Sequence, residues 1–204
     1  MFRLSLILAT VERSHESLGR AVHLRMDMTD ADDGLMKLLN PVHEWDHTTG
    51  PAEAQFTLVE YGDYQCSNCG RLFGVLRHLQ AELGSRLRVV YRHYPLSGVH
   101  KQAQAAAEAA EAAGAQGRFW EMHDLLFENQ GALERKHLLN YAERLALDVD
   151  RFRQELKAET YGERVRKDFI AGVQNGVKGT PGLFLNGVRE LGEFDERRVR
   201  ALLG

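Results

Sequence analysis

Cys66 and Cys69 are the only cysteines in this 204-residue chain, and two residues separate them. An apolar stretch ending at Tyr61 precedes the pair, and a helical pattern follows it. A strand, a tight turn and a helix that begins at such a pair are typical of a thiol–disulfide redox site. Because unpaired N–H groups and the dipole at a helix start favour negative charge, we expect Cys66 to be the low-pKa nucleophile. Cys69, one turn into the helix, is then expected to resolve the mixed disulfide.

Two other interpretations of the cysteine pair are weaker. Half of a zinc site needs further ligands, and the chain has no second cysteine pair and no downstream histidine pair at zinc-finger spacing. An inert disulfide across so short a loop adds little stability. We therefore expect no metal, and the sequence implies no nucleotide or flavin.

Composition limits the classes of protein that remain. The length suits one large domain, or one domain with an insertion. A net charge of −3 without a Lys/Arg cluster excludes nucleic acid as an expected partner. No run of 18 apolar residues is present, so we expect no transmembrane helix.

Residues 1–40 form an N-terminal extension to which the sequence assigns no role. Met1–Val11 weakly resembles a signal segment, but Glu12 and Arg13 follow at once and no A-x-A-like cleavage site is present. We expect a cytoplasmic protein, with export as the alternative if Met1–Val11 belongs to a signal. A short helix through Asp33–Leu39 is the simplest structure for the end of this segment.

The remaining chain alternates strand and helix patterns. Gln55–Tyr61 and Leu87–Tyr94 are apolar enough for strands, and a helix between them ends near Gly84, which predicts a parallel pair with a crossover. Five helices are expected next, at Lys101–Ala115, Arg118–Glu128, Leu133–Leu147, Asp150–Ala158 and Tyr161–Asn175. Asp148 is placed to cap the fourth of these helices.

A hairpin and a helix are expected to close the chain. Asn186-Gly187 is a strong two-residue hairpin signal between the strands Gly182–Leu185 and Val188–Leu191. Phe194–Leu203 then has the pattern of a final helix.

Several segments resemble the DsbA-like disulfide oxidoreductases, over about Pro41 to the C-terminus. The segments are Asp46-His47-x-x-Gly50-Pro51-Ala52, Leu58–Cys66, Tyr91–Leu96 and Val177-Lys178-Gly179-Thr180-Pro181. The resemblance implies an α/β thioredoxin fold over residues 41–204, with a helical domain inserted at about 98–175. The chain departs from the family at Ser67-Asn68, where relatives often have proline followed by His or Tyr, and this leaves the redox potential open.

The resemblance also implies roles for two further positions. It implies that the Thr180–Pro181 bond is cis and lies beside Cys66, where the Thr180 backbone can pair with an extended substrate; an ordinary trans-proline is the alternative. It supports an acidic residue at Glu60, whose carboxyl is then desolvated and able to exchange a proton with Cys69. A solvated glutamate at a strand end is the alternative.

Three more side chains are weaker candidates. His93 is a possible charge partner of the thiols, although a histidine at the core edge bonded to backbone is the more common case. Phe119 and Trp120 can line a substrate groove, but helical aromatics more often belong to the core.

The sequence therefore predicts a thiol–disulfide oxidoreductase that acts through Cys66 and Cys69. Its expected partners are thiol- or disulfide-containing proteins and a second redox protein, and neither the direction of exchange nor the oligomeric state follows from the sequence. The alternative is a non-catalytic peptide-binding or chaperone module whose cysteine pair is a redox switch. Turnover of a disulfide substrate distinguishes the two.

Overall fold

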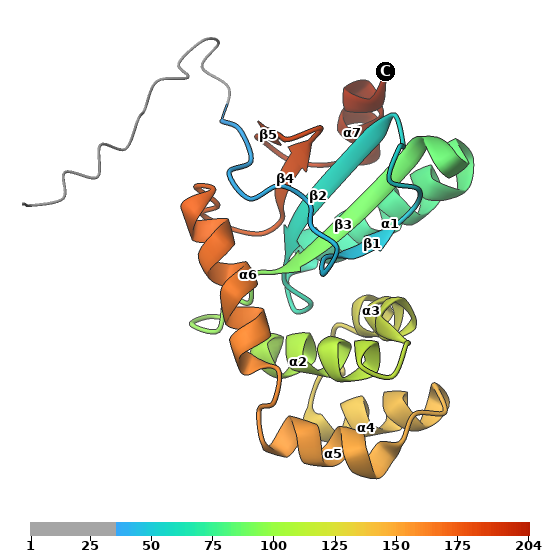
Figure 1. Cartoon of the computed structure of the whole chain (residues 1–204), viewed down its shortest axis with the longest axis vertical. Coiled ribbons are helices and arrows are strands. Elements are labelled where there is room, and N and C mark those ends of the chain that lie inside the picture. Colours follow the sequence, from blue (N-terminus) through green and yellow to red (C-terminus); the bar gives the residue numbers. More distant parts are fainter. Residues whose placement is uncertain (1–35) are drawn as a thin grey trace, which may run out of the picture. The chain divides into compact units, whose positions relative to one another are not determined.

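The computed structural model describes residues 36–204 (Figure 1). The expectations for Met1–Val11 and for most of the N-terminal extension lie outside these residues. The helix expected through Asp33–Leu39 is absent from its described part, 36–39. Lys37 instead forms a β-bridge with Val188, because the backbone here is extended against the C-terminal hairpin.

A five-stranded sheet in the order β1-β3-β2-β4-β5 forms the frame of the fold. Only β2 and β3 are parallel to each other, and the other neighbours are antiparallel. The strands are β1 His47–Thr49, β2 Phe56–Gly62, β3 Leu87–His93, β4 Gly182–Leu185 and β5 Val188–Glu190. The central place of β2 explains why both of its faces are apolar. The short β1 was not predicted, since three residues of mixed polarity carry no apolar periodicity.

Helix α1, Ser67–Leu83, makes the crossover between the two parallel strands. Its buried face includes Leu72, Leu76 and Leu79, which recur at helical spacing. The helix ends at Gly84, whose φ of 54° suits glycine, and a short 3-10 turn, η1 Gly84–Arg86, leads into β3. The predicted parallel pair with its crossover is thereby confirmed.

Five helices lie between β3 and β4, as the predicted helical insertion requires. They are α2 Ala103–Gly114, α3 Phe119–Glu128, α4 Arg135–Arg144, α5 Val149–Lys157 and α6 Gly162–Gln174. The alanine-rich α2 is buried along most of its length and contacts α3, α4, α5 and α6, because small side chains allow close helix packing (Figure 1). Asp148 caps α5 by accepting a hydrogen bond from the Arg151 N–H.

The chain closes with the expected hairpin and helix. Asn186 and Gly187 both have positive φ, as a two-residue turn between β4 and β5 demands. The last helix, α7 Glu196–Leu203, begins two residues later than predicted, because Asp195 caps it through the Arg198 N–H. Among the described residues, no helix has the length and apolar character needed to cross a membrane.

Candidate active site

Cys66 and Cys69 lie at the start of α1, where the sequence places them. Cys66 is the N-cap residue, with extended backbone angles, and the helix proper begins at Ser67. Its exposed fraction is 8%, whereas Cys69 is fully buried. Both are free thiols in the structure. Of the two sulfurs, only that of Cys66 is therefore open to a substrate.

The site stabilises the thiolate of Cys66. The largest cause is a hydrogen bond from the Cys69 thiol, and it outweighs the opposing effect of burial. Thr180 and the backbone N–H groups of Asn68 and Cys69 contribute further hydrogen bonds, and together they lower the pKa of Cys66 to about 5. At neutral pH Cys66 is thus a thiolate, as expected for a residue at a helix start.

Glu60 lies in β2 behind Cys69, only 2% exposed. Burial raises the pKa of its carboxyl to about 8, the polar contact with Cys69 lowers it, and the charge of Cys66 raises it. Burial also raises the pKa of Cys69 well above its usual value, and its hydrogen bond to Cys66 and the charge of Glu60 add to the effect. Glu60 and Cys69 are therefore both protonated at neutral pH beside an ionised Cys66.

A small cavity of about 30 Å³ borders Glu60. Its lining is mainly apolar, and Tyr91, His123 and Asp124 add polar groups. Its volume exceeds the minimum needed for one water molecule, so a water has room beside Glu60.

Thr180 and Pro181 lie across from Cys66. The Thr180–Pro181 peptide bond is cis in the structure. The Cys66 Sγ lies 3.4 Å from the Thr180 carbonyl oxygen, and the buried Thr180 hydroxyl has no partner other than this sulfur among the described residues. The loop before β4 therefore places both backbone and hydroxyl groups beside the nucleophile.

A hollow of about 410 Å³ adjoins these two residues. Its lining comes from the cis-proline loop, the first turns of α1, the segment before α7 and the first residue of α7. The lining residues are Asn68, Arg71, Val75, Thr180, Pro181, Gly192, Glu193, Phe194, Asp195 and Glu196.

Gln130 is a functional candidate that the sequence analysis missed. It follows α3, and its Nε2 donates to the carbonyl oxygens of Tyr64 at 2.9 Å and Cys66 at 2.8 Å. Added bulk at Gly70 would overlap this amide, so the glycine leaves room for it. The helical insertion therefore holds the turn that carries Cys66. No local motif marks the contact, because 64 residues separate Gln130 from Cys66.

Asp63 is a second missed residue. Its buried carboxylate accepts hydrogen bonds from the Gln65 N–H at 2.7 Å, the Leu96 N–H at 2.8 Å and His100 Nδ1 at 2.8 Å. It joins the turn before Cys66 to the loop after β3. An aspartate two residues before a turn amide is a familiar local signal, which a closer sequence analysis could have used.

His93 and the two aromatic candidates lie away from the thiols. His93 is fully buried, and its Nε2 hydrogen-bonds to Glu111 Oε1 at 3.0 Å. Phe119 is buried in the core, and the Trp120 indole donates to the Thr48 carbonyl at 3.1 Å. The structure thus places His93 in a separate cluster with His47 and Glu111, whose ligand atoms are close enough to hold a metal ion.

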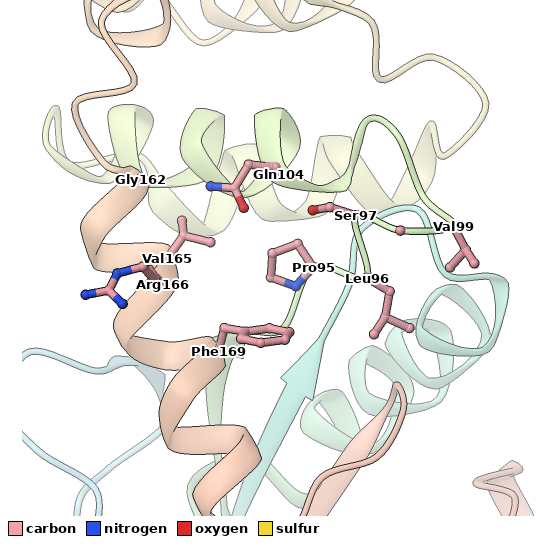
Figure 2. Close-up of a pocket in the computed structure, with 10 residues that line it drawn as sticks. Pro95, Leu96, Ser97, Val99, Gln104, Gly162, Val165, Arg166 and Phe169 are labelled. Carbon is pink, nitrogen blue, oxygen red and sulfur yellow. The ribbon is translucent and has the colours of Figure 1, made fainter.

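A second hollow, of about 610 Å³, lies between α6 and the loop after β3 (Figure 2). Figure 2 shows Val165 and Phe169 of α6 on the side that faces Pro95. The cavity is mainly apolar, and its lining includes neither cysteine nor Thr180. It is separate from the hollow beside the cis-proline.

Comparisons with known proteins agree with this fold. The family model described as Thioredoxin matches residues 43–203. Among solved structures, the chain is similar to oxidised BdbD from Bacillus subtilis, with a TM-score of 0.69 and 22% identity over 78% of this chain and 90% of that one. It is also similar to α-DsbA1 from Wolbachia pipientis, with a TM-score of 0.68 and 19% identity over 81% and 92% of the two chains.

The relatives with higher sequence identity carry a different kind of name. The chain is 43% identical to a protein named Na(+)/H(+) antiporter NhaA 1 from Salinispora arenicola, over 98% of this chain. It is 44% identical to one named Na(+)/H(+) antiporter NhaA from Herminiimonas arsenicoxydans, over 78% of this chain. The chain spans 29% and 25% of the length of these relatives, so it corresponds to one part of much longer proteins.

Proposed function

Since the chain belongs to the thioredoxin family and has the DsbA-like form of its fold, we propose that it is a thiol–disulfide oxidoreductase that works through Cys66 and Cys69. One observation carries the proposal. The pKa of the accessible Cys66 falls to about 5, while that of the buried Cys69 rises well above its usual value. The two cysteines therefore differ in charge at neutral pH, as attacking and resolving thiols must.

The lowered pKa of Cys66 favours a role in the oxidation of substrate thiols. A thiolate stabilised at Cys66 stabilises the dithiol form, and this makes the disulfide form a stronger oxidant. A substrate thiolate attacks Cys66 of the disulfide, the Cys66–Cys69 bond breaks, and Cys69 leaves with the electron pair. Glu60, protonated up to a pH of about 8, can give that thiolate its proton.

The second half of the reaction completes the transfer of two electrons. A second substrate thiolate attacks the substrate sulfur of the mixed disulfide, and Cys66 leaves as a stabilised thiolate. The products are a substrate disulfide and the dithiol enzyme. A disulfide-bearing redox partner must then reoxidise the pair.

The hollow beside Thr180 and Pro181 is the proposed substrate groove. Both residues of the cis-proline loop line it, and the carbonyl oxygen of one of them, Thr180, lies 3.4 Å from Cys66 Sγ. An extended peptide can pair with the backbone of that loop while its cysteine reaches Cys66. Thr180 and Pro181 are thus proposed as substrate-binding residues.

Catalysed turnover tests the proposal. The oxidised protein is mixed with a reduced peptide that contains two cysteines, in glutathione buffers, and both the oxidation rate and the reduction potential are measured. We expect multiple turnovers, which Cys66→Ser abolishes and which Cys69→Ser greatly slows, because it cannot form the Cys66–Cys69 disulfide that oxidises the peptide. A single stoichiometric event without turnover contradicts the enzyme and favours the redox-switched chaperone.

The sequence relatives favour one class of partner. Because proteins named sodium–proton antiporters contain a region similar to 98% of this chain, we propose that an antiporter lies beside this domain in its working context. Cysteine crosslinking between a Cys69→Ser domain and an antiporter made in the same cells tests this, and equal trapping of unrelated membrane proteins contradicts it. The cytoplasmic location expected from the sequence stays a prediction.

A further inference from the structure

His47, His93 and Glu111 form a cluster at the junction of the sheet with the helical insertion, which the proposed thiol chemistry does not use. His47 comes from β1, His93 from β3 and Glu111 from α2. Because His47 pairs with Tyr91, His93 lies two residues further along the same face of the sheet. Glu111 meets both rings from the helix that contacts α6 and α3.

The two histidine side chains approach the same carboxylate oxygen of Glu111. Nε2 of His47 lies 2.9 Å and Nε2 of His93 lies 3.0 Å from the same atom, Oε1 of Glu111. All three ligand atoms lie within 4.8 Å of one another. Atoms bound to Zn²⁺ at 2.0–2.1 Å, with ligand angles between square and tetrahedral, lie about 2.9–3.4 Å apart. The two nitrogen–oxygen distances already fit one coordination sphere.

From this cluster we propose a zinc site in which His47, His93 and Glu111 supply three ligands. Two imidazoles and a carboxylate are a common protein ligand set for Zn²⁺, with water or another small ligand in the fourth position. The site is distinct from the thiols, and it would join β1, β3 and α2 through one ion.

The surroundings can accommodate the ion. Each imidazole must carry its proton on Nδ1, and Nδ1 of His93 has no hydrogen-bond partner among the described residues. The ion would replace the hydrogen bonds that the two Nε2–H groups donate to Glu111 Oε1. Arg164 Nε lies 3.8 Å from Glu111 Oε1, but its guanidinium is also paired with Asp168, which offsets its charge.

His47 offers the way in. Its side chain is 19% exposed, whereas His93 is fully buried and Glu111 nearly so. It lies on a three-residue edge strand, and its ring is stacked on Phe119, so entry of the ion requires this partly exposed ring to shift.

The test measures Zn²⁺ binding in protein whose cysteines cannot take part. The Cys66→Ser/Cys69→Ser variant is heated with and without ZnCl₂, and Zn²⁺ affinity is measured by titration calorimetry. We expect Zn²⁺ to raise the unfolding midpoint, because an ion that binds only the folded state stabilises it. In the same background, His47→Ala should weaken Zn²⁺ binding at least about tenfold. His78→Ala, which removes an exposed histidine of α1, should leave it unchanged.

Two further measurements keep the proposal falsifiable. Co²⁺ in the same variant should give the visible bands of a tetrahedral or five-coordinate nitrogen–oxygen site. Glu111→Gln should abolish those bands; if it fails to fold, His47→Ala alone decides. A zinc-induced shift that requires reduced Cys66 and Cys69, or that survives His47→Ala undiminished, overturns the site.

Discussion

The carboxyl of Glu60 in β2 lies against the thiol of Cys69 in α1, in the buried layer beneath the reactive sulfur, and the charge of Glu60 raises the pKa of Cys69. This contact joins a strand residue to a helix residue that follows it by nine positions. Through it, Cys69 can change its protonation state without direct contact with solvent. Cys66, the more accessible thiol, is thus the nucleophile, and the buried Glu60 and Cys69 carry the protons.

The pH dependence of alkylation should identify Cys66 as the nucleophile. Because the pKa of Cys66 is lowered to about 5, its reaction with iodoacetamide should be half-maximal near that pH and constant above about 7. Mass spectrometry of the modified peptide checks the site of labelling. In Cys66→Ser, labelling of Cys69 should be slow even at pH 8, and preferential labelling of Cys69 in the wild type would reverse the assignment.

Replacement of Glu60 by glutamine should slow the exchange step while preserving the fold. Glutamine keeps the shape of the side chain but cannot deliver a proton, so the rate at which Cys69 departs should fall about 10²–10⁴-fold at pH 7. Stopped-flow measurement of mixed-disulfide formation checks this step. Glu53→Gln, at an exposed position, serves as the control. Unchanged rates in Glu60→Gln between pH 6 and 9 rule out proton transfer by Glu60.

Stability should depend on pH through two opposing groups. The pKa of Cys66 is lowered, so its contribution is present above pH 9 and is lost as pH falls toward 5. The pKa of Glu60 is raised, so its contribution is present below pH 4.5 and is lost as pH rises toward 8. Between about pH 5 and 8 the two changes cancel, and the reduced wild type should show nearly constant stability.

Single variants should reveal the separate contributions of Cys66 and Glu60 to the pH dependence of stability. In Cys66→Ser the free energy of unfolding should fall as pH rises from 5 to 8, because only the effect of Glu60 remains. In Glu60→Gln it should rise over the same range. At pH 7 the glutamine variant should gain on the order of 3 kcal/mol, since it no longer keeps a proton on a buried acid. Urea denaturation at three pH values under reducing conditions checks the slopes, and parallel slopes in all three proteins would refute the coupling.

The sequence was sufficient to predict those features of the fold and the site that depend on neighbouring residues. The helix start at Cys66, the turn at Asn186-Gly187 and the cap at Asp148 depend on a few adjacent residues, and the structure has all three. The parallel pairing of β2 and β3 and the central place of β2 followed from the apolar strands and the helix between them. At the C-terminus β5 ends one residue before the predicted Leu191, and α7 starts later than predicted because the capping role of Asp195 overrides the apolar pattern that begins at Phe194.

Contacts across the sequence could not be predicted in the same way. Gln130 reaches the Cys66 carbonyl from beyond α3, and Glu111 meets His93 across the junction of sheet and insertion. Nothing in the local pattern of either residue distinguishes it from a solvated side chain. These partners depend on how the insertion packs against the sheet, which hydrophobic periodicity alone does not determine.

Gln130 should act as a positioning residue for Cys66. Gln130→Met keeps a similar volume but removes the donor, so the carbonyls of Tyr64 and Cys66 lose one hydrogen bond each. The first turn of α1 should loosen, and the pKa of Cys66 should rise as its N–H donors lose alignment. Thiolate absorbance near 240 nm, titrated against pH, checks the shift. Gln116→Met, which removes an amide bonded to the Asp148 backbone, is the matched control and should leave the titration unchanged.

Thr180 should tune the oxidising power of the pair. Its hydroxyl is buried, has no other partner among the described residues and lowers the pKa of Cys66. Thr180→Val removes the hydroxyl at almost constant volume, so the Cys66 thiolate should lose stabilisation. Less stabilisation of the dithiol makes the disulfide a weaker oxidant, by about 30 mV for each tenfold change in the exchange constant. Equilibration with glutathione should therefore give a more negative potential, and Thr160→Val, on the exposed loop before α6, should not change it. If the reduction potential of Thr180→Val stays constant while the pKa of Cys66 rises, the prediction is wrong, because stabilisation of the thiolate then does not set the reduction potential of this site.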